Sequence, residues 1–208
     1  MPRVCTLDSV NGMVKEAMEE IRCFIAIELP DDIREGLGRL IARLKSRQPD
    51  VKWVDPAAIH LTLKFLGYVA PDRVGEITEA ITDAACGIPP FSLEVKDLGV
   101  FPSLNRVRVV WIGVEGETDK LLQLQKRLET NLDILGFPPE EREFTPHLTL
   151  ARVRDTASPA EREELVRLIT ATKASPIGSF TAKSVSLMSS QLARTGAVYT
   201  QLAAVKLK

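Results

Sequence analysis

The chain has 208 residues, of which 45% are hydrophobic and 26% are charged, a composition typical of globular proteins that fold in water. With 27 basic and 28 acidic residues its net charge is -1, which excludes a generally basic nucleic-acid-binding surface and leaves room only for a local positive site. No apolar run is long enough to span a membrane, and the three scattered cysteines indicate a reducing cytoplasm rather than a disulfide framework.

The first half of the chain predicts five elements after a polar tail at residues 1–20. Short apolar or alternating runs predict strands, and apolar residues at helical spacing predict helices that bury one face. In chain order we expect a strand at residues 22–29, a helix from Asp31, a strand at 60–66, a helix from Pro71 and a strand at 91–98.

The second half repeats this order of elements. We expect a strand at 107–114, a helix from Thr118, a strand at 147–153, a helix from Ser158, a strand at 180–189 and a last strand at 197–207. The sequence Ser-Pro-Ala-Glu at residues 158–161 is typical of a capped helix start. Three pairs of landmarks are 87 residues apart, which indicates an internal duplication: Asp31 and Thr118, His60 and His147, and Pro71 and Ser158.

The duplication predicts an α+β fold of two pseudo-symmetric β-α-β-α-β lobes, with mixed or antiparallel sheets and helices on the outer faces. We expect a single two-lobed domain over residues 21–208. Its lobes are expected at about 21–100 and 105–208, with a chain free to cross between them. The strands that begin at His60 and His147 should then face each other across a central cleft.

The only two histidines of the chain each begin the tetrapeptide His-Leu-Thr-Leu, at residues 60–63 and 147–150. Because residues i and i+2 of a strand share a face, His60 and Thr62 point to one side, as do His147 and Thr149. The leucines point the other way, into the core. A solvated sheet face would explain one such motif, but it is a poor explanation for two copies that hold every histidine of the chain.

Two imidazoles and two hydroxyls suit the hydrolysis of a phosphodiester. One histidine can take a proton from water and the other can protonate the leaving oxygen, while threonine hydroxyls stabilise charge on the phosphate. A zinc site is the alternative use of two histidines. The motifs supply no third ligand at short spacing, so we expect no metal.

At these motifs the sequence resembles the two-histidine phosphoesterase superfamily, which carries paired His-x-Thr/Ser-x motifs. Within it, the chain resembles the bacterial and archaeal RNA 2',3'-cyclic phosphodiesterases, also called 2'-5' RNA ligases. The resemblance covers about residues 21–207. It is carried by RCFIAIELPDDI, WVDPAAIHLTLKFLG, LGVFPSLNRVRVVWIGV, FTPHLTLARV and the stretch from Ser190 to Tyr199.

The resemblance implies hydrolysis of a terminal 2',3'-cyclic phosphate to a 2'-phosphomonoester, without metal or other cofactor, on RNA ends or small cyclic nucleotides. It implies that His60 protonates the ribose 3' oxygen and that His147 activates water, although the sequence itself leaves this order open. The alternatives are 2'-5' ligation by the same site and nucleotide binding without turnover. Nothing in the sequence indicates an obligate protein partner, so we expect a monomer.

Two cations are further candidates for phosphate contacts. Lys64 continues the face of His60 and Thr62 by alternation; a solvated surface lysine is the alternative. The resemblance gives Arg152 a phosphate contact, which a guanidinium suits well; a surface arginine is the alternative. Strict alternation places Arg152 opposite His147, so the strand must bend if the two are to meet.

Aromatic residues near the motifs are candidates for stacking on a base. Phe101 and Phe144 fall in predicted loops and are the two candidates, with anchoring of the loop as the alternative. Phe65 alternates away from His60 and is expected in the core. Trp53 and Trp111 are expected to pack in the core or at its rim.

Overall fold

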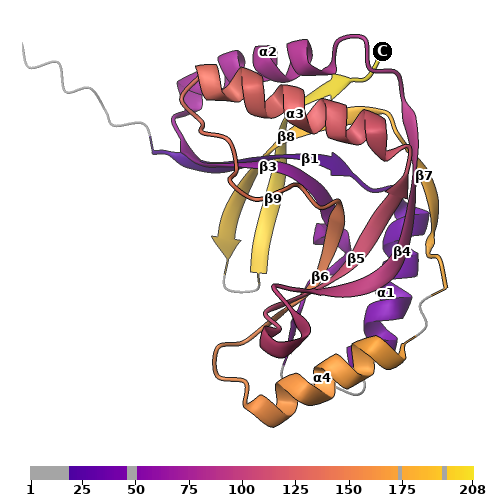
Figure 1. The fold of residues 1–208 in the computed structure, drawn as a ribbon. Helices are drawn as coiled ribbons and strands as arrows, with labels where there is room; N and C mark the ends of the chain where they lie inside the picture. Colours follow the sequence, from indigo (N-terminus) through magenta and orange to yellow (C-terminus); the bar gives the residue numbers. More distant parts are fainter. Residues whose placement is uncertain (1–18, 46–50, 173–174, 194–195) are drawn as a thin grey trace, which may run out of the picture.

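The computed structural model describes residues 19–208 except 46–50, 173–174 and 194–195, so most of the expected tail lies outside the described residues (Figure 1). Short 3-10 turns occur at Pro56–Ala58, Pro71–Arg73 and Leu104–Arg106. The helices and strands are β1 (Ile21–Glu28), α1 (Asp31–Lys45), β2 (Val51–Trp53), β3 (His60–Val69), α2 (Val74–Ala85), β4 (Phe91–Phe101), β5 (Val109–Gly116), α3 (Thr118–Ile134), β6 (His147–Val153), α4 (Pro159–Ala171), β7 (Gly178–Ala182), β8 (Ser184–Ala193) and β9 (Gly196–Lys206).

The strands form two sheets in which every described pair is antiparallel. The four-stranded sheet has the order β3-β1-β8-β9, and the five-stranded sheet has the order β2-β6-β5-β4-β7. Helices α2 and α3 lie together over the four-stranded sheet, whereas α1 and α4 pack on the five-stranded sheet (Figure 1). The predicted α+β class, with helices outside the sheets, is confirmed.

The two sheets are not built from consecutive halves of the chain, so the boundary expected near residue 100 does not separate them. Strand β4, from the first half, pairs with β5 and β7 in the five-stranded sheet. Strands β8 and β9, from the second half, complete the four-stranded sheet beside β1. A short hairpin joins β4 to β5, and this local antiparallel pairing costs little chain entropy. The order of elements is therefore repeated along the chain, although each sheet takes strands from both repeats.

The strand expected at residues 180–189 is in fact two strands in different sheets. Strand β7 pairs with β4, and after Lys183 strand β8 pairs with β1. Both halves are rich in buried apolar residues, and the apolar pattern alone does not show where the chain passes from one sheet to the other.

One hydrophobic core runs through both sheets and all four helices. Helix α1 buries the apolar face that its sequence predicts, and Leu61 and Leu148 of the two motifs are fully buried in the same core. Helix α4 begins with the predicted cap, because Ser158 and Glu161 bond each other's backbone N–H groups. No helix within the described ranges is both long and apolar enough to cross a membrane.

Candidate active site

The two His-Leu-Thr-Leu motifs lie on strands that approach each other where the sheets meet. Strand β3 is the edge of the four-stranded sheet, and β6 is the second strand of the five-stranded sheet; the two strands are in contact. His60, Thr62, His147 and Thr149 are partly exposed, whereas the leucines between them are buried. Each motif therefore presents its imidazole and hydroxyl on the face opposite the helices.

Both imidazoles are held by the same backbone contact. Nδ1 of His60 lies 2.9 Å from the carbonyl oxygen of Ala58, and Nδ1 of His147 lies 2.6 Å from that of Thr145. Because a carbonyl oxygen only accepts hydrogen bonds, Nδ1 must carry the proton in both rings. Nε2 is then left to take up or give away a proton at the reacting face.

Aromatic rings enclose His60 on the helix-free face of the four-stranded sheet. The ring of Phe24 stacks on the imidazole at 4.5 Å between centroids, and Tyr199 meets it edge-on at 5.0 Å. Phe24 also belongs to a small buried cluster on this face, with Ala26 and Met188. These contacts fix the orientation of the imidazole and remove water from it.

His147 has a comparable aromatic surround. Phe101 meets its imidazole edge-on at 5.0 Å, and the Trp111 ring lies 6.2 Å away. Gly99 allows this arrangement, because a Cβ at that position would lie 2.2 Å from the Trp111 ring. Phe101, predicted to stack on a base, thus contacts the histidine itself, and Trp111, predicted to serve packing, is also part of the site.

The surroundings lower the pKa of both histidines. For each, burial is the main cause, and the bond to the backbone carbonyl opposes it. The carboxylate of Glu28 further raises the pKa of His60 and Arg34 lowers it, whereas the charge of Arg152 lowers the pKa of His147. Both imidazoles are therefore mainly neutral near pH 7 in the free protein.

Glu28 was not predicted as a site residue. It is the cross-strand partner of His60 on β1, and its carboxylate accepts hydrogen bonds from Gln201 Nε2 at 2.6 Å and Ser186 Oγ at 3.2 Å. The alternation of Phe24, Ala26 and Glu28 along β1 places all three on the His60 face. This alternation is visible in the sequence, but only the pairing of β1 with β3 shows that it places Glu28 beside His60.

A β-bulge in β3 overturns the prediction for Lys64. Thr62 pairs with Ala26 and Lys64 with Ile25, so Leu63 is an extra residue. A bulge reverses the alternation beyond it, so Lys64 points into the core and Phe65 takes the His60 face. Phe65, predicted to be buried, is 52% exposed.

Lys64 is an internal ion-pair residue and does not reach the site. Its side chain is 1% exposed; it pairs with Glu129 of α3 and donates a hydrogen bond of 2.8 Å to the carbonyl oxygen of Pro138. The prediction that Lys64 meets the phosphate is therefore wrong.

A second bulge lies at the corresponding place in β6. Thr149 pairs with Trp111 and Ala151 with Val110, so Leu150 is the extra residue. Arg152 consequently lies on the same face as His147, which is the bend that a phosphate contact would require.

Phe144 lies in the loop before β6 and is partly buried against the main core. This packing accounts for its position, so the prediction that it stacks on a base is not supported. Within the described ranges, no three His, Cys, Asp or Glu side chains are placed to hold a metal ion together.

Comparisons with known proteins agree with this geometry. Residues 29–194 match the family model of the 2'-5' RNA ligase superfamily. The RNA 2',3'-cyclic phosphodiesterase of Methanothermobacter thermautotrophicus is 35% identical over 188 residues, covering 90% of this chain and 100% of that protein. The phosphodiesterase of the same name from Methanocaldococcus jannaschii is 32% identical over 179 residues, covering 86% and 96%.

Solved structures give the same result. The crystal structure of E. coli LigT complexed with 3'-AMP is similar with a TM-score of 0.73 and 29% identity, covering 91% of this chain and 99% of that one. The protein TT0787 of Thermus thermophilus is similar with a TM-score of 0.74 and 26% identity, covering 90% and 98%. The resemblance carried by the two histidine motifs is thus confirmed, and the chain belongs to the 2'-5' RNA ligase superfamily.

Proposed function

We propose that this chain hydrolyses the terminal 2',3'-cyclic phosphate of RNA to a 2'-phosphomonoester, with His60 and His147 as the acid–base pair and without a metal ion. The observation that carries the proposal is the matched pair of imidazoles. Each is fixed through Nδ1 and offers Nε2 on strands that meet. The RNA 2',3'-cyclic phosphodiesterases among its relatives support the choice of substrate.

The proposed reaction begins with neutral His147 and protonated His60. Nε2 of His147 takes a proton from a water molecule as the water oxygen bonds to phosphorus. Nε2–H of His60 gives its proton to the ribose 3' oxygen as the bond from phosphorus to that oxygen breaks. The phosphate remains on the 2' oxygen. His147 then loses its proton to solvent and His60 regains one, which restores the starting state.

Electrostatics support the order of these roles. Glu28 favours the protonated form of His60 and outweighs the opposing Arg34, whereas Arg152 disfavours protonation of His147. The general acid must hold a proton when the general base does not, and the charged neighbours favour protonation of His60 and disfavour that of His147.

The phosphate oxygens have their own partners in this proposal. Thr62 and Thr149 share the faces of the two histidines, and their hydroxyls can donate to the non-bridging oxygens. Arg152 adds a charged donor on the His147 side.

Cys23 and Cys86, both free, are consistent with this reaction taking place in a reducing cytoplasm.

Loss of either histidine should lower turnover by about a hundredfold or more, because a general acid or base contributes at least that much. Thr62→Val or Thr149→Val should cost about tenfold to a thousandfold, as expected for one donor to the developing charge. The measurement is the opening of an RNA oligonucleotide with a 2',3'-cyclic phosphate end, with 2'- and 3'-phosphate products separated by chromatography.

The same assay tests the alternatives. Leu122→Ala, on the exposed side of α3, is the control for surface substitution and should keep full turnover. EDTA should have little effect. Full activity in the double histidine variant would contradict the proposal. A 3'-phosphate product would show that the 2' oxygen, and not the 3' oxygen, is the leaving group. A 2'-5' linked product with a 5'-hydroxyl partner would favour ligation, and binding without turnover would favour a nucleotide-binding module.

A further inference from the structure

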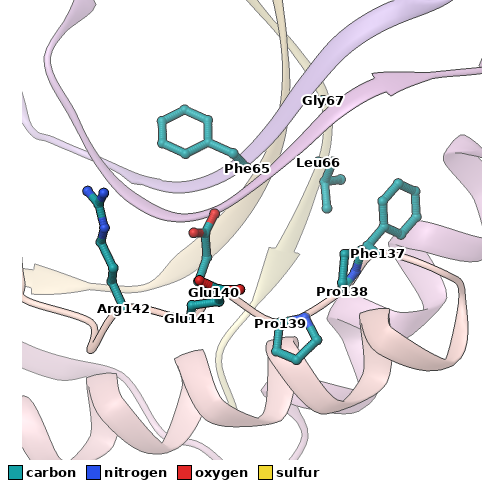
Figure 2. A pocket seen from close by; sticks show the side chains of 9 residues that line it. All are labelled: Phe65, Leu66, Gly67, Phe137, Pro138, Pro139, Glu140, Glu141 and Arg142. Atoms are coloured by element: carbon teal, nitrogen blue, oxygen red, sulfur yellow. The ribbon is translucent and has the colours of Figure 1, made fainter.

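A pocket of about 510 Å³ lies between the end of β3 and the loop that joins α3 to β6 (Figure 2). Figure 2 shows Glu140 and Arg142 extending from the loop toward β3, on the side where Phe65 projects. Phe137 and Pro139 add apolar lining. The pocket thus combines an aromatic ring, apolar walls and a cation, none of which the proposed reaction uses.

Two aromatic rings connect the pocket to the sheet face that carries His60. The bulge at Leu63 turns Phe65 onto that face, and both Phe65 and His60 contact the ring of Phe24. The distances to Phe24 are 6.3 Å from Phe65 and 4.5 Å from His60, between ring centroids. A ligand with its phosphate at His60 can therefore continue into the pocket along one sheet surface.

A second exposed aromatic residue continues the same line. Tyr68 pairs with Arg22 and Phe65 pairs with Phe24, and residues 22 and 24 of β1 point to the same face. Tyr68 is 70% exposed and Phe65 is 52% exposed. Exposed apolar side chains that lie together on one face often mark a binding site, and nucleic-acid bases stack on aromatic rings of this kind.

Two cations on this surface, Arg142 and Arg22, are available to contact the phosphates of a backbone. The guanidinium of Arg142 makes no hydrogen bond or ion pair with any described residue, and Arg22 is exposed beside Tyr68. The carboxylates of Glu140 and Glu141 would repel a phosphate, which directs it toward Arg142. A carboxylate can in turn accept a hydrogen bond from the amino group of a base.

We propose that this surface binds the single-stranded RNA that precedes the cyclic phosphate. The nucleotide next to the end occupies the pocket with its base on Phe65 and its phosphate at Arg142, and the nucleotide before it stacks on Tyr68. This inference rests on the proposed function, which places the cyclic phosphate at His60. It makes oligonucleotide ends, rather than cyclic mononucleotides, the preferred substrates.

The test is a length series of 2',3'-cyclic phosphates, from the mononucleotide to the trinucleotide, with KM and kcat measured for each. Wild-type KM should fall at each added nucleotide. Phe65→Ala and Phe65→Leu should remove most of the gain from mononucleotide to dinucleotide, a change of about tenfold for one stacked base. Tyr68→Ala should remove the gain from dinucleotide to trinucleotide. Arg142→Gln should weaken dinucleotide binding and make it less dependent on salt.

Matched controls keep the outcomes distinct. Leu122→Ala removes an exposed apolar side chain from α3 and should leave the whole series unchanged, and Phe65→Leu keeps an apolar contact with Phe24 if Phe65→Ala is unstable. A wild-type KM that is independent of length overturns the inference, as does an equal loss at every length in Phe65→Leu.

If no cyclic phosphate of any length is opened, the proposed function fails. Fluorescence titration with a trinucleotide 2'-phosphate then tests the surface by itself: loss of binding in Phe65→Leu supports it, and unchanged binding overturns it.

Discussion

His60 has a carboxylate for a neighbour, whereas His147 has a guanidinium. The two imidazoles are otherwise anchored alike, each through Nδ1 to the carbonyl of the residue two positions earlier. Their charged neighbours differ: Glu28, opposed by the weaker effect of Arg34, favours protonation of His60, whereas Arg152 disfavours protonation of His147. Such single side chains can assign unequal roles to two sites that arose as copies.

The pH dependence of kcat/KM should reflect the lowered pKa values of both histidines. The proposed reaction needs one protonated and one neutral imidazole, so its optimum lies between the two pKa values and hence below about pH 6.5. A bound phosphate anion favours protonation and raises both values, so the optimum of kcat should lie at higher pH. Initial rates across a pH series at low and at saturating substrate check this order.

Glu28→Gln tests whether the charge of Glu28 raises the pKa of His60. Glutamine keeps an acceptor for Gln201 and Ser186 but removes the charge, so the pKa of His60 should fall and that of His147 should stay. Proton NMR titration resolves this directly, since the chain has only two histidines. An unchanged midpoint for His60 would refute the electrostatic distinction between the two.

The sequence predicts the two histidines and two threonines as candidate site residues, because each pair is local and repeated, and the structure brings the two motif strands into contact. The sequence was insufficient for Phe24, Trp111 and Tyr199, which reach the imidazoles from other strands. Their roles depend on which strands are neighbours, and single-strand alternation carries no such information.

At the scale of the element, the bulges after the two motifs decide which residues join the site. Alternation is reliable only up to the first bulge, which is why Lys64 and Phe65 were each predicted on the wrong face. No glycine marks either position, and each bulge becomes visible only in the pairing with the neighbouring strand. The equivalent positions beyond the bulges carry Phe65 in one repeat and Arg152 in the other.

Lys64 should matter for stability rather than for binding. Lys64→Met leaves Glu129 charged and 12% exposed without its cation, although Gln125 still donates to it, so the free energy of unfolding should fall by about 3 kcal/mol. Urea denaturation measures this loss. Adding Glu129→Gln removes the unpaired charge and should recover part of the stability, with KM close to that of the parent chain. A large rise in KM in this folded double variant would restore Lys64 as a phosphate contact.

At the scale of the whole molecule, the repeated order of elements was visible in the sequence and its spatial result was not. The expected helices and strands are nearly all present, and α1 buries the predicted face. The sequence leaves a crossing of the chain between lobes open, because the patterns of β4, β8 and β9 are compatible with either sheet. The β4–β5 hairpin closes locally, whereas the pairing of β8 with β1 joins distant parts of the chain around the shared core.

The exchange of strands has a consequence for dividing the chain. Strand β4 lies between β5 and β7, and β1 lies between β3 and β8, so a cut between residues 103 and 104 separates partners in both sheets. Fragments 1–103 and 104–208 should each be insoluble or unfolded when expressed alone, and should reconstitute a one-to-one complex when co-expressed, as judged by capture through a tag on one fragment. Cooperative unfolding of either fragment by itself would contradict this. Because the two repeats share both sheets in this way, deleting either repeat would also unfold the other. Both histidines would then be lost together.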